Sequence, residues 1–221
     1  ELDPENVEWI NDAAEYIYLR IGDYNRALEY LNKALKIQEK VLGTEHPDTA
    51  VSYNDIGVCY DNLGDYDKAL EYYNKALKIQ EKVLGTKHPD TVLSYNNIGG
   101  CYNSLGDYEN ALKYYNKALK ISEKVLGTEH PFTAISYNNI GVCYDNLGDY
   151  DKALEYYNKA LKIYEKVLGA EHPSTALSYN NIGACYDNLG DYDKALVYHN
   201  KALEIREKVL GTEHPSTAAS Y

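Results

Sequence analysis

The sequence predicts an all-α protein in which antiparallel helix pairs stack as an α-solenoid. Two observations predict this fold: one motif returns at a fixed interval, and each interval carries apolar residues spaced for two helices. The motif Gly-Thr-Glu-His-Pro begins at Gly43, recurs unchanged at Gly127 and Gly211, and recurs with one change at Gly85 and Gly169. Every step, such as Gly43 to Gly85, is 42 residues without a gap, so each unit should occupy an equivalent place in a stack.

The first half of each interval has the spacing of an amphipathic helix. In the interval that starts at Gly43, the i, i+3, i+4, i+7 pattern is set by Tyr53, Ile56, Gly57, Tyr60 and Leu63. A proline such as Pro89 suits the first turn of such a helix. We therefore expect first helices near residues 48–62, 90–104, 132–146 and 174–188.

The second half of each interval carries a second helical pattern. Its apolar positions include Tyr66, Ala69, Leu70, Tyr73, Ala76 and Leu77. Gly64 can adopt the left-handed conformation that ends the first helix, and Asp65 is a suitable N-cap for the second. The small residues Gly57 and Ala69 should let the two helices approach closely. We expect second helices near residues 66–84, 108–126, 150–168 and 192–210.

These intervals predict a single array over residues 1–221. Its units lie near residues 1–42, 43–84, 85–126, 127–168 and 169–210, and residues 211–221 begin a sixth repeat that is cut short. The first unit keeps Gly22-Asp23-Tyr24 and a second helix near residues 24–42. Its first helix, near residues 5–20, is diverged, since Glu15 stands where later repeats carry glycine and Trp9 occurs once.

Composition and charge exclude several classes of function. The formal net charge is −12, which argues against nucleic acid and anionic membranes as partners, because both attract clustered Lys and Arg. No apolar run approaches the roughly 18–20 residues of a membrane span. The cysteines, one per repeat, are expected to be small buried hydrophobes with free thiols. Free thiols fit a reducing compartment, and we expect a cytoplasmic protein.

The repeated polar residues do not form a recognisable catalytic or metal site. No glycine-rich phosphate loop appears, and no nucleophile recurs beside a base, so we expect neither an enzyme nor a cofactor. His46 and its equivalents precede proline at each junction. Their equal spacing along a stack argues against a shared metal ion and favours a role in packing or capping the next helix. The repeated tyrosines are expected to pack in the core with the hydroxyl at a polar edge.

The motif Tyr53-x-x-Ile56-Gly57-x-x-Tyr60, followed by Gly64-Asp65-Tyr66, resembles the tetratricopeptide repeat. The resemblance recurs through almost the whole chain. One departure is Glu81, since the family has proline there and the second helix should consequently run on through Leu84. The 42-residue length and the Leu-Gly-x-x-His-Pro junction are similar to kinesin light chain repeats.

The resemblance implies a right-handed superhelix whose concave side is lined by first helices and binds peptides. The implied binding positions are an asparagine series, a second asparagine beside it, an aliphatic series and two acids. In order, these are Asn54, Asn96, Asn138 and Asn180; Asn97, Asn139 and Asn181; Leu93, Ile135 and Leu177; Asp145 and Asp187.

Two interpretations of these positions stay open. An asparagine amide can pair with the backbone of any extended peptide, but the Asn-Asn pair could instead fix neighbouring backbones within the array. The aliphatic residues could contact a partner or pack on the preceding unit. Because the implied positions include acids but neither Lys nor Arg, the partner segment is expected to be neutral or basic rather than acidic.

The function expected from these features is a scaffold that binds extended peptides or partner proteins on its concave face. The alternative is a structural spacer or self-assembling segment. An uncovered end on a self-complementary stack can recruit another molecule head to tail.

Overall fold

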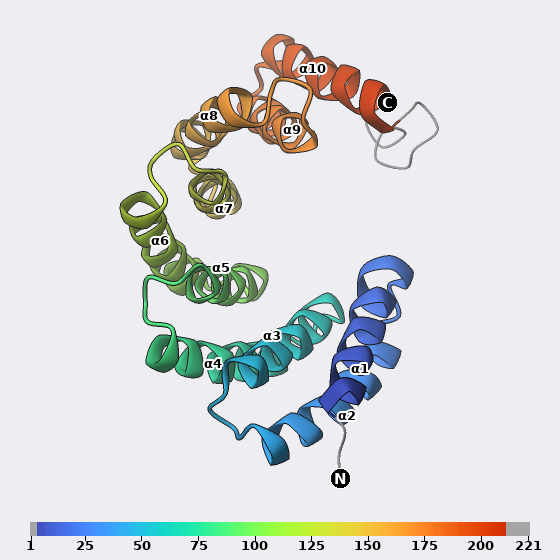
Figure 1. The fold of residues 1–221 in the computed structure, drawn as a ribbon. Coiled ribbons are helices and arrows are strands. Elements are labelled where there is room, and N and C mark those ends of the chain that lie inside the picture. The colour runs from blue at the N-terminus through green and yellow to red at the C-terminus, as the bar shows by residue number, and fades with distance from the viewer. Residues whose placement is uncertain (1–3, 211–221) are drawn as a thin grey trace. The chain divides into compact units, whose positions relative to one another are not determined.

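The computed structural model describes residues 4–210, which form α-helices and one short π-helix (Figure 1). In chain order these are α1 (Pro4–Tyr16), η1 (Ile17–Ile21), α2 (Tyr24–Val41), α3 (Pro47–Asn62), α4 (Tyr66–Val83), α5 (Pro89–Ser104), α6 (Tyr108–Val125), α7 (Pro131–Asn146), α8 (Tyr150–Val167), α9 (Pro173–Asn188) and α10 (Tyr192–Leu210). The expected helices are confirmed to within one or two residues at most ends. The expected sixth repeat, residues 211–221, lies outside the described residues.

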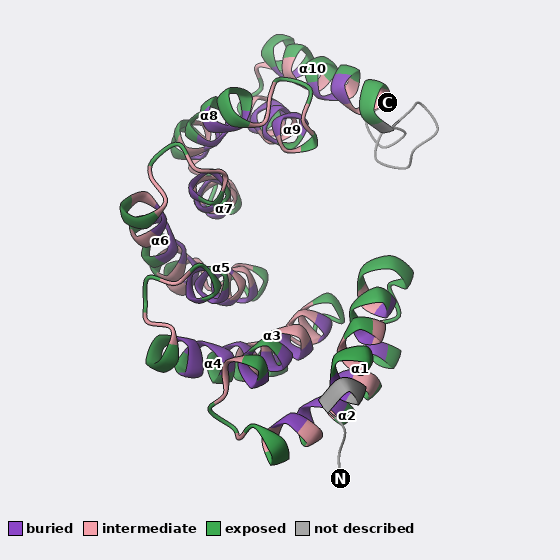
Figure 2. Cartoon of the chain, in the orientation of Figure 1, coloured by how far each residue is buried: buried purple, intermediate pink, exposed green. Residues whose placement is uncertain are grey.

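Helices that follow one another in sequence pack against one another. Within repeats, α3 contacts α4, α7 contacts α8, and α9 contacts α10; between repeats, α2 contacts α3, α4 contacts α5, and α8 contacts α9. The chain forms two compact units whose boundary falls within α6, between Lys117 and Ala118. Each helix presents both buried and exposed residues (Figure 2). The predicted α-solenoid of stacked helix pairs is confirmed, and the right-handed sense that the resemblance implies stays a prediction.

One glycine per repeat lets the two helices of a pair meet. A Cβ atom placed on Gly57 would lie 2.6 Å from the ring carbons of Tyr73, which is closer than real side-chain contacts allow. Gly141 meets Tyr157 in the same way, and Gly183 meets the ring of His199. His199 therefore takes the place of the tyrosine, as expected from its position in the repeat.

The predicted helix ends are also present. Gly64 has φ of 76° and Gly85 has φ of 85°, both in the left-handed region that glycine enters without a steric penalty. The Asp65 side chain accepts a hydrogen bond from the Lys68 backbone N–H at the start of α4. These caps place both turns at fixed positions in the repeat.

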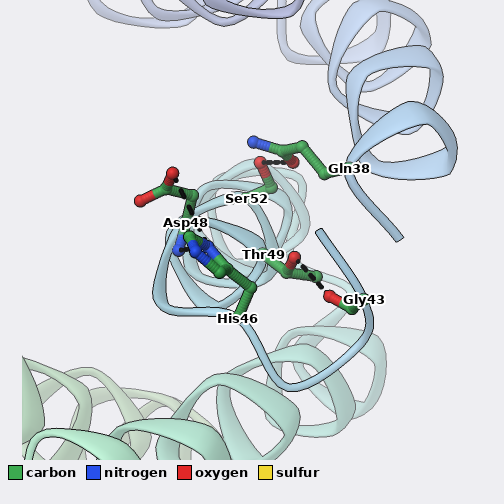
Figure 3. A network of polar contacts seen from close by, with 6 residues as sticks. All are labelled: Gln38, Gly43, His46, Asp48, Thr49 and Ser52. Atoms are coloured by element: carbon green, nitrogen blue, oxygen red, sulfur yellow. Dashed lines mark hydrogen bonds and ion pairs between the residues drawn. The ribbon is translucent and has the colours of Figure 1, made fainter. Parts of the chain in front are cut away.

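The junction between repeats is held by a small polar network (Figure 3). His46 is the N-cap of α3, and its Nδ1 accepts a hydrogen bond of 3.2 Å from the Asp48 N–H. The buried Thr49 hydroxyl donates to the Gly43 carbonyl. His88, His130 and His172 cap α5, α7 and α9 in the same way. The capping role expected for these histidines is confirmed, and His214 lies outside the described residues.

The tyrosines that begin each first-helix pattern join consecutive repeats. Tyr53 is buried, and its hydroxyl donates to the Glu39 carboxylate of the preceding second helix at 2.6 Å. Tyr95, Tyr137 and Tyr179 donate to Glu81, Glu123 and Glu165 in turn. The ring is thus in the core while its hydroxyl reaches a polar edge, as expected.

The first repeat departs from the others near Glu15. Helix α1 ends at Tyr16 and a π-helix continues to Ile21, whereas α3 remains α-helical through the equivalent positions. Glu15 is exposed, although its equivalent Gly57 is buried. A glutamate cannot make the close contact that the glycine makes, so the wider turn accompanies the turning of Glu15 to the surface.

A buried serine distinguishes one repeat interface from its neighbours. In the earlier repeats, Ser52 donates to Gln38 at 2.6 Å and Ser94 donates to Gln80 at 2.7 Å, with all four residues buried. The next position in this series is Ser122, whose hydroxyl oxygen is buried without a hydrogen-bond partner. A buried polar group without a partner costs about 1–3 kcal/mol.

Replacing Ser122 with glutamine should therefore stabilise the protein. The Ser122→Gln amide oxygen would accept from Ser136, as Gln38 accepts from Ser52, and we expect the free energy of unfolding to rise by about 1 kcal/mol. Urea unfolding measures the change. The reverse variant, Gln80→Ser, should lose a similar amount, and a loss in both variants would contradict this account.

Candidate functional site

The aliphatic positions form an exposed series on the first helices. Leu93, Ile135 and Leu177 lie on α5, α7 and α9 and are each between 38% and 49% exposed. Val51 holds the same position on α3 and is likewise exposed. Half of each side chain therefore faces solvent rather than the preceding repeat, which leaves apolar surface for a partner to cover.

The asparagine pairs join adjacent repeats through their side chains. The Asn97 amide donates to the Asn54 side-chain oxygen at 3.0 Å, and the Asn181 amide donates to Asn138 at 3.1 Å. In each pair the second asparagine of one repeat reaches the first asparagine of the repeat before it. These residues thus have a structural role, although the bond joins side chains and not the neighbouring backbones that the sequence suggested.

The other asparagines of the series differ in burial. Asn96 is buried, its amide donates to the Val92 carbonyl, and its side-chain oxygen has no hydrogen-bond partner. Asn139 and Asn180 are half-buried. An Asn side chain offers two donor hydrogens and an acceptor, so a single cross-repeat bond still leaves capacity for a ligand.

The predicted acidic residues already have partners within the protein. Asp145 is half-buried and accepts a hydrogen bond from the Cys185 thiol of the next repeat, and desolvation raises the pKa of its carboxyl. Asp61 accepts from the Cys101 thiol at 3.6 Å in the same arrangement. Asp187 is exposed and lies 2.9 Å from Nε2 of His199.

The thiol-to-carboxylate bonds were missed by sequence reasoning. The cysteines are buried small residues, as expected, but Cys101 and Cys185 also donate across the repeat interface. Desolvation raises the pKa of Cys59, Cys143 and Cys185 to about 12, so these thiols are poor nucleophiles. The only sequence signal for the bond is an acid that recurs two residues after a cysteine, and a buried residue followed by a solvated helix face produces the same pattern.

The described residues offer little to metals or membranes. Among residues 4–210, no cluster of three or more His, Cys, Asp and Glu side chains has the arrangement of a metal site. Within the same range, every helix is too short or too polar to span a bilayer.

The matched helix pairs, their caps and the exposed first-helix positions define the chain as a helical-repeat protein. The tetratricopeptide repeat model matches residues 16–82, 62–121, 90–166, 146–208 and 174–221. The chain therefore belongs to the tetratricopeptide repeat family. This fold is generally a non-enzymatic scaffold for protein interactions. No curated protein matches the chain in sequence.

Solved structures of the same fold include kinesin light chain-like proteins. BtubC (BKLC) from P. vanneervenii is 30% identical over 96% of this chain and 85% of its own, with a TM-score of 0.78. The nearly identical TPR-like repeats of a putative Podospora anserina kinesin light chain are 25% identical over 94% and 98% of the two chains, with a TM-score of 0.75. A Rap protein complexed with competence and sporulation factor is 18% identical over 100% and 64%, with a TM-score of 0.79, and shares the fold.

A buried carboxylate marks the start of the asparagine series. Asp55 holds the position of Asn97 and Asn181, but it faces the diverged first repeat, where the Tyr18 hydroxyl donates to it at 3.5 Å. Desolvation, with the nearby negative charge of Glu15, raises the pKa of Asp55 to about 7 against the opposing hydrogen bonds from Asn54 and Tyr18. An asparagine here would carry no charge to desolvate.

The raised pKa predicts a pH-dependent penalty at the first repeat. The folded state holds the Asp55 proton more tightly than the unfolded state, so stability falls as the pH rises from about 4 through 7 and then levels off. Asp55→Asn should remove this penalty and raise the free energy of unfolding by about 1–2 kcal/mol at pH 8, with little change at pH 4. Chemical unfolding of both proteins across this range measures the difference, and an equal gain at both pH values would contradict it.

Proposed function

We propose that the chain binds extended segments of partner proteins along the exposed surface of its first helices. The observation that carries this proposal is the series of half-exposed aliphatic residues, Leu93, Ile135 and Leu177. The asparagines beside them retain donor and acceptor capacity for a peptide backbone. In the resemblance to tetratricopeptide domains these are the peptide-contacting positions, and the surface is concave.

The charges of this surface favour a neutral or basic partner segment. Asp61, Asp145 and Asp187 lie on the first helices, whereas the equivalent groove positions carry neither Lys nor Arg. An acidic segment would meet like charges there. The cytoplasm is the compartment we propose, because free buried thiols persist where the environment is reducing.

The proposal predicts that Leu177→Ser weakens partner binding about tenfold while the fold is kept. The side chain is half exposed, so its loss should cost less than about 1 kcal/mol of stability. A partner captured by pull-down with the wild-type chain would be purified, and its affinity for each variant measured by calorimetry.

The matched control is Val167→Ser, because Val167 is 46% exposed and lies at the end of a second helix, outside the series. Its partner affinity should equal that of the wild type. Equal losses in both variants, or no loss in Leu177→Ser, would count against binding by the first-helix surface.

A second candidate function is end-to-end self-assembly, as a spacer or filament-forming segment. It is favoured by the apolar residues exposed on the terminal helix α10, where Leu196 is 61% exposed and Tyr192 and Val197 are also exposed. The equivalent leucines Leu70 and Leu154 are less exposed. A surface of this kind can accept another molecule head to tail without closing a ring.

Light scattering over a concentration series separates this function from a monomeric scaffold. If assembly occurs, the mean mass should rise with concentration, and Leu196→Glu should abolish the rise by placing a charge on the apolar surface. Leu147→Glu is the control, since Leu147 is an exposed leucine at the end of α7. A constant monomer mass for the wild type would eliminate the assembly function.

A further inference from the structure

A cavity opens in the first unit between α1, the end of α2 and the start of α3. Its volume is about 460 Å³, which is larger than an aromatic side chain. The apolar part of its lining includes Val7, Ile37, Val41, Leu42 and Val51. The volume and the lining are those of a site that can hold an organic group.

The fourth repeat, residues 127–168, indicates what the cavity can hold. There Ala134 and the ring of Tyr137 on α7 pack with Ile163 and Tyr164 on α8. Three repeats earlier in the sequence, the positions of Ala134 and Tyr137 are occupied by Glu8 and Asn11. The cavity therefore lies where the first repeat has no tyrosine ring to pack between its two helices.

The neighbouring residues are consistent with this comparison. Ile163 is 6% exposed beside Tyr137, whereas Ile37, its equivalent in the first repeat, is only half-buried. Both residues have the same place on the second helix. The difference follows from the replacement of the ring by the short side chain of Asn11.

The polar part of the lining consists of acceptors. The side-chain oxygen of Asn11 is buried and has no hydrogen-bond partner. The carboxylates of Glu8 and Asp48 stand at the same cavity, and its lining contains neither Lys nor Arg. A ligand that supplies hydrogen-bond donors or a positive charge would satisfy these groups, and an anion would be repelled.

We propose that this cavity is a binding site for a tyrosine side chain on a basic segment of a partner protein. The phenol ring would lie against Ile37 and Val51, and its hydroxyl would donate to Asn11 or Glu8. Within the protein, four tyrosines of this type already pack a ring between helices and donate the hydroxyl to a glutamate, as Tyr53 does to Glu39. A Lys or Arg beside the tyrosine would face Glu8 and Asp48.

The site can be tested with tyramine, which joins a phenol to an ammonium group. We expect tyramine to bind with a dissociation constant on the order of 1 mM. In a methyl-labelled NMR titration it should shift the resonances of Ile37, Val41, Leu42 and Val51. Phenethylamine, which lacks the hydroxyl, should bind several-fold more weakly.

Two variants examine the cavity itself. Asn11→Tyr supplies the ring that later repeats carry, and it should weaken tyramine binding at least tenfold by filling the space. Asn74→Tyr, which adds a tyrosine at an exposed site on α4, should bind tyramine as the wild type does. Unchanged binding by Asn11→Tyr, or no methyl shifts in the wild type, would overturn the proposal.

Glu8→Ala keeps the test decisive if Asn11→Tyr does not fold. Alanine is the residue found at the equivalent position Ala134, so this variant should fold. It should bind tyramine several-fold more weakly than the wild type, while neutral N-acetyltyrosinamide should bind both proteins equally. Equal tyramine binding by wild type and Glu8→Ala would contradict the assigned role of the acidic lining.

The source of the phenol is settled by comparing tyramine with the capped peptide Lys-Tyr-Lys. The peptide should bind more tightly because it adds a second positive charge beside the ring. Tighter binding of free tyramine would overturn the assignment to a protein segment and indicate a small amine. The inference goes beyond the proposed function, and the two fail separately: Leu177→Ser tests the first-helix surface and should leave tyramine binding unchanged.

Discussion

Each helix pair buries the outer side of its second helix only against the first helix of the next repeat. This packing is the constraint on which the rest of the structure depends, because a single pair leaves too much apolar surface in water. Polar bonds cross the same interface at fixed places. Tyr53 reaches Glu39, Asn97 reaches Asn54 and Cys101 reaches Asp61. A shift in register would break these bonds together, so they specify how consecutive repeats align.

The fold was predictable from the sequence because its causes are local and repeated. Apolar spacing, Gly64 with Asp65, and the His-Pro junction each act within a few residues, and every repeat states them again. The π-helix after Tyr16 was not predictable, since it depends on how Glu15 meets α2. The cross-repeat partners were also beyond sequence reasoning. Asn97 and Asn54 are 43 positions apart, and only the packing geometry brings them together.

The candidate site was predictable as a set of positions but not as a set of free groups. The aliphatic residues are exposed as a binding surface requires, whereas Asn54, Asn138 and Asp145 already serve the interface between repeats. Specificity for a partner and cohesion of the array thus draw on the same side chains. The first repeat separates the two demands, since Asn11 and Glu8 in place of tyrosine and alanine leave a cavity.

The placement of one buried cysteine in each of four repeats has a consequence for observing the molecule in motion. Each thiol is inaccessible while its repeat is packed, and the high pKa keeps it protonated. An alkylating reagent can therefore modify a given cysteine only when that repeat opens. The rate of modification at Cys59, compared with that at Cys185, reports how often each region of the array breathes, without any label being introduced.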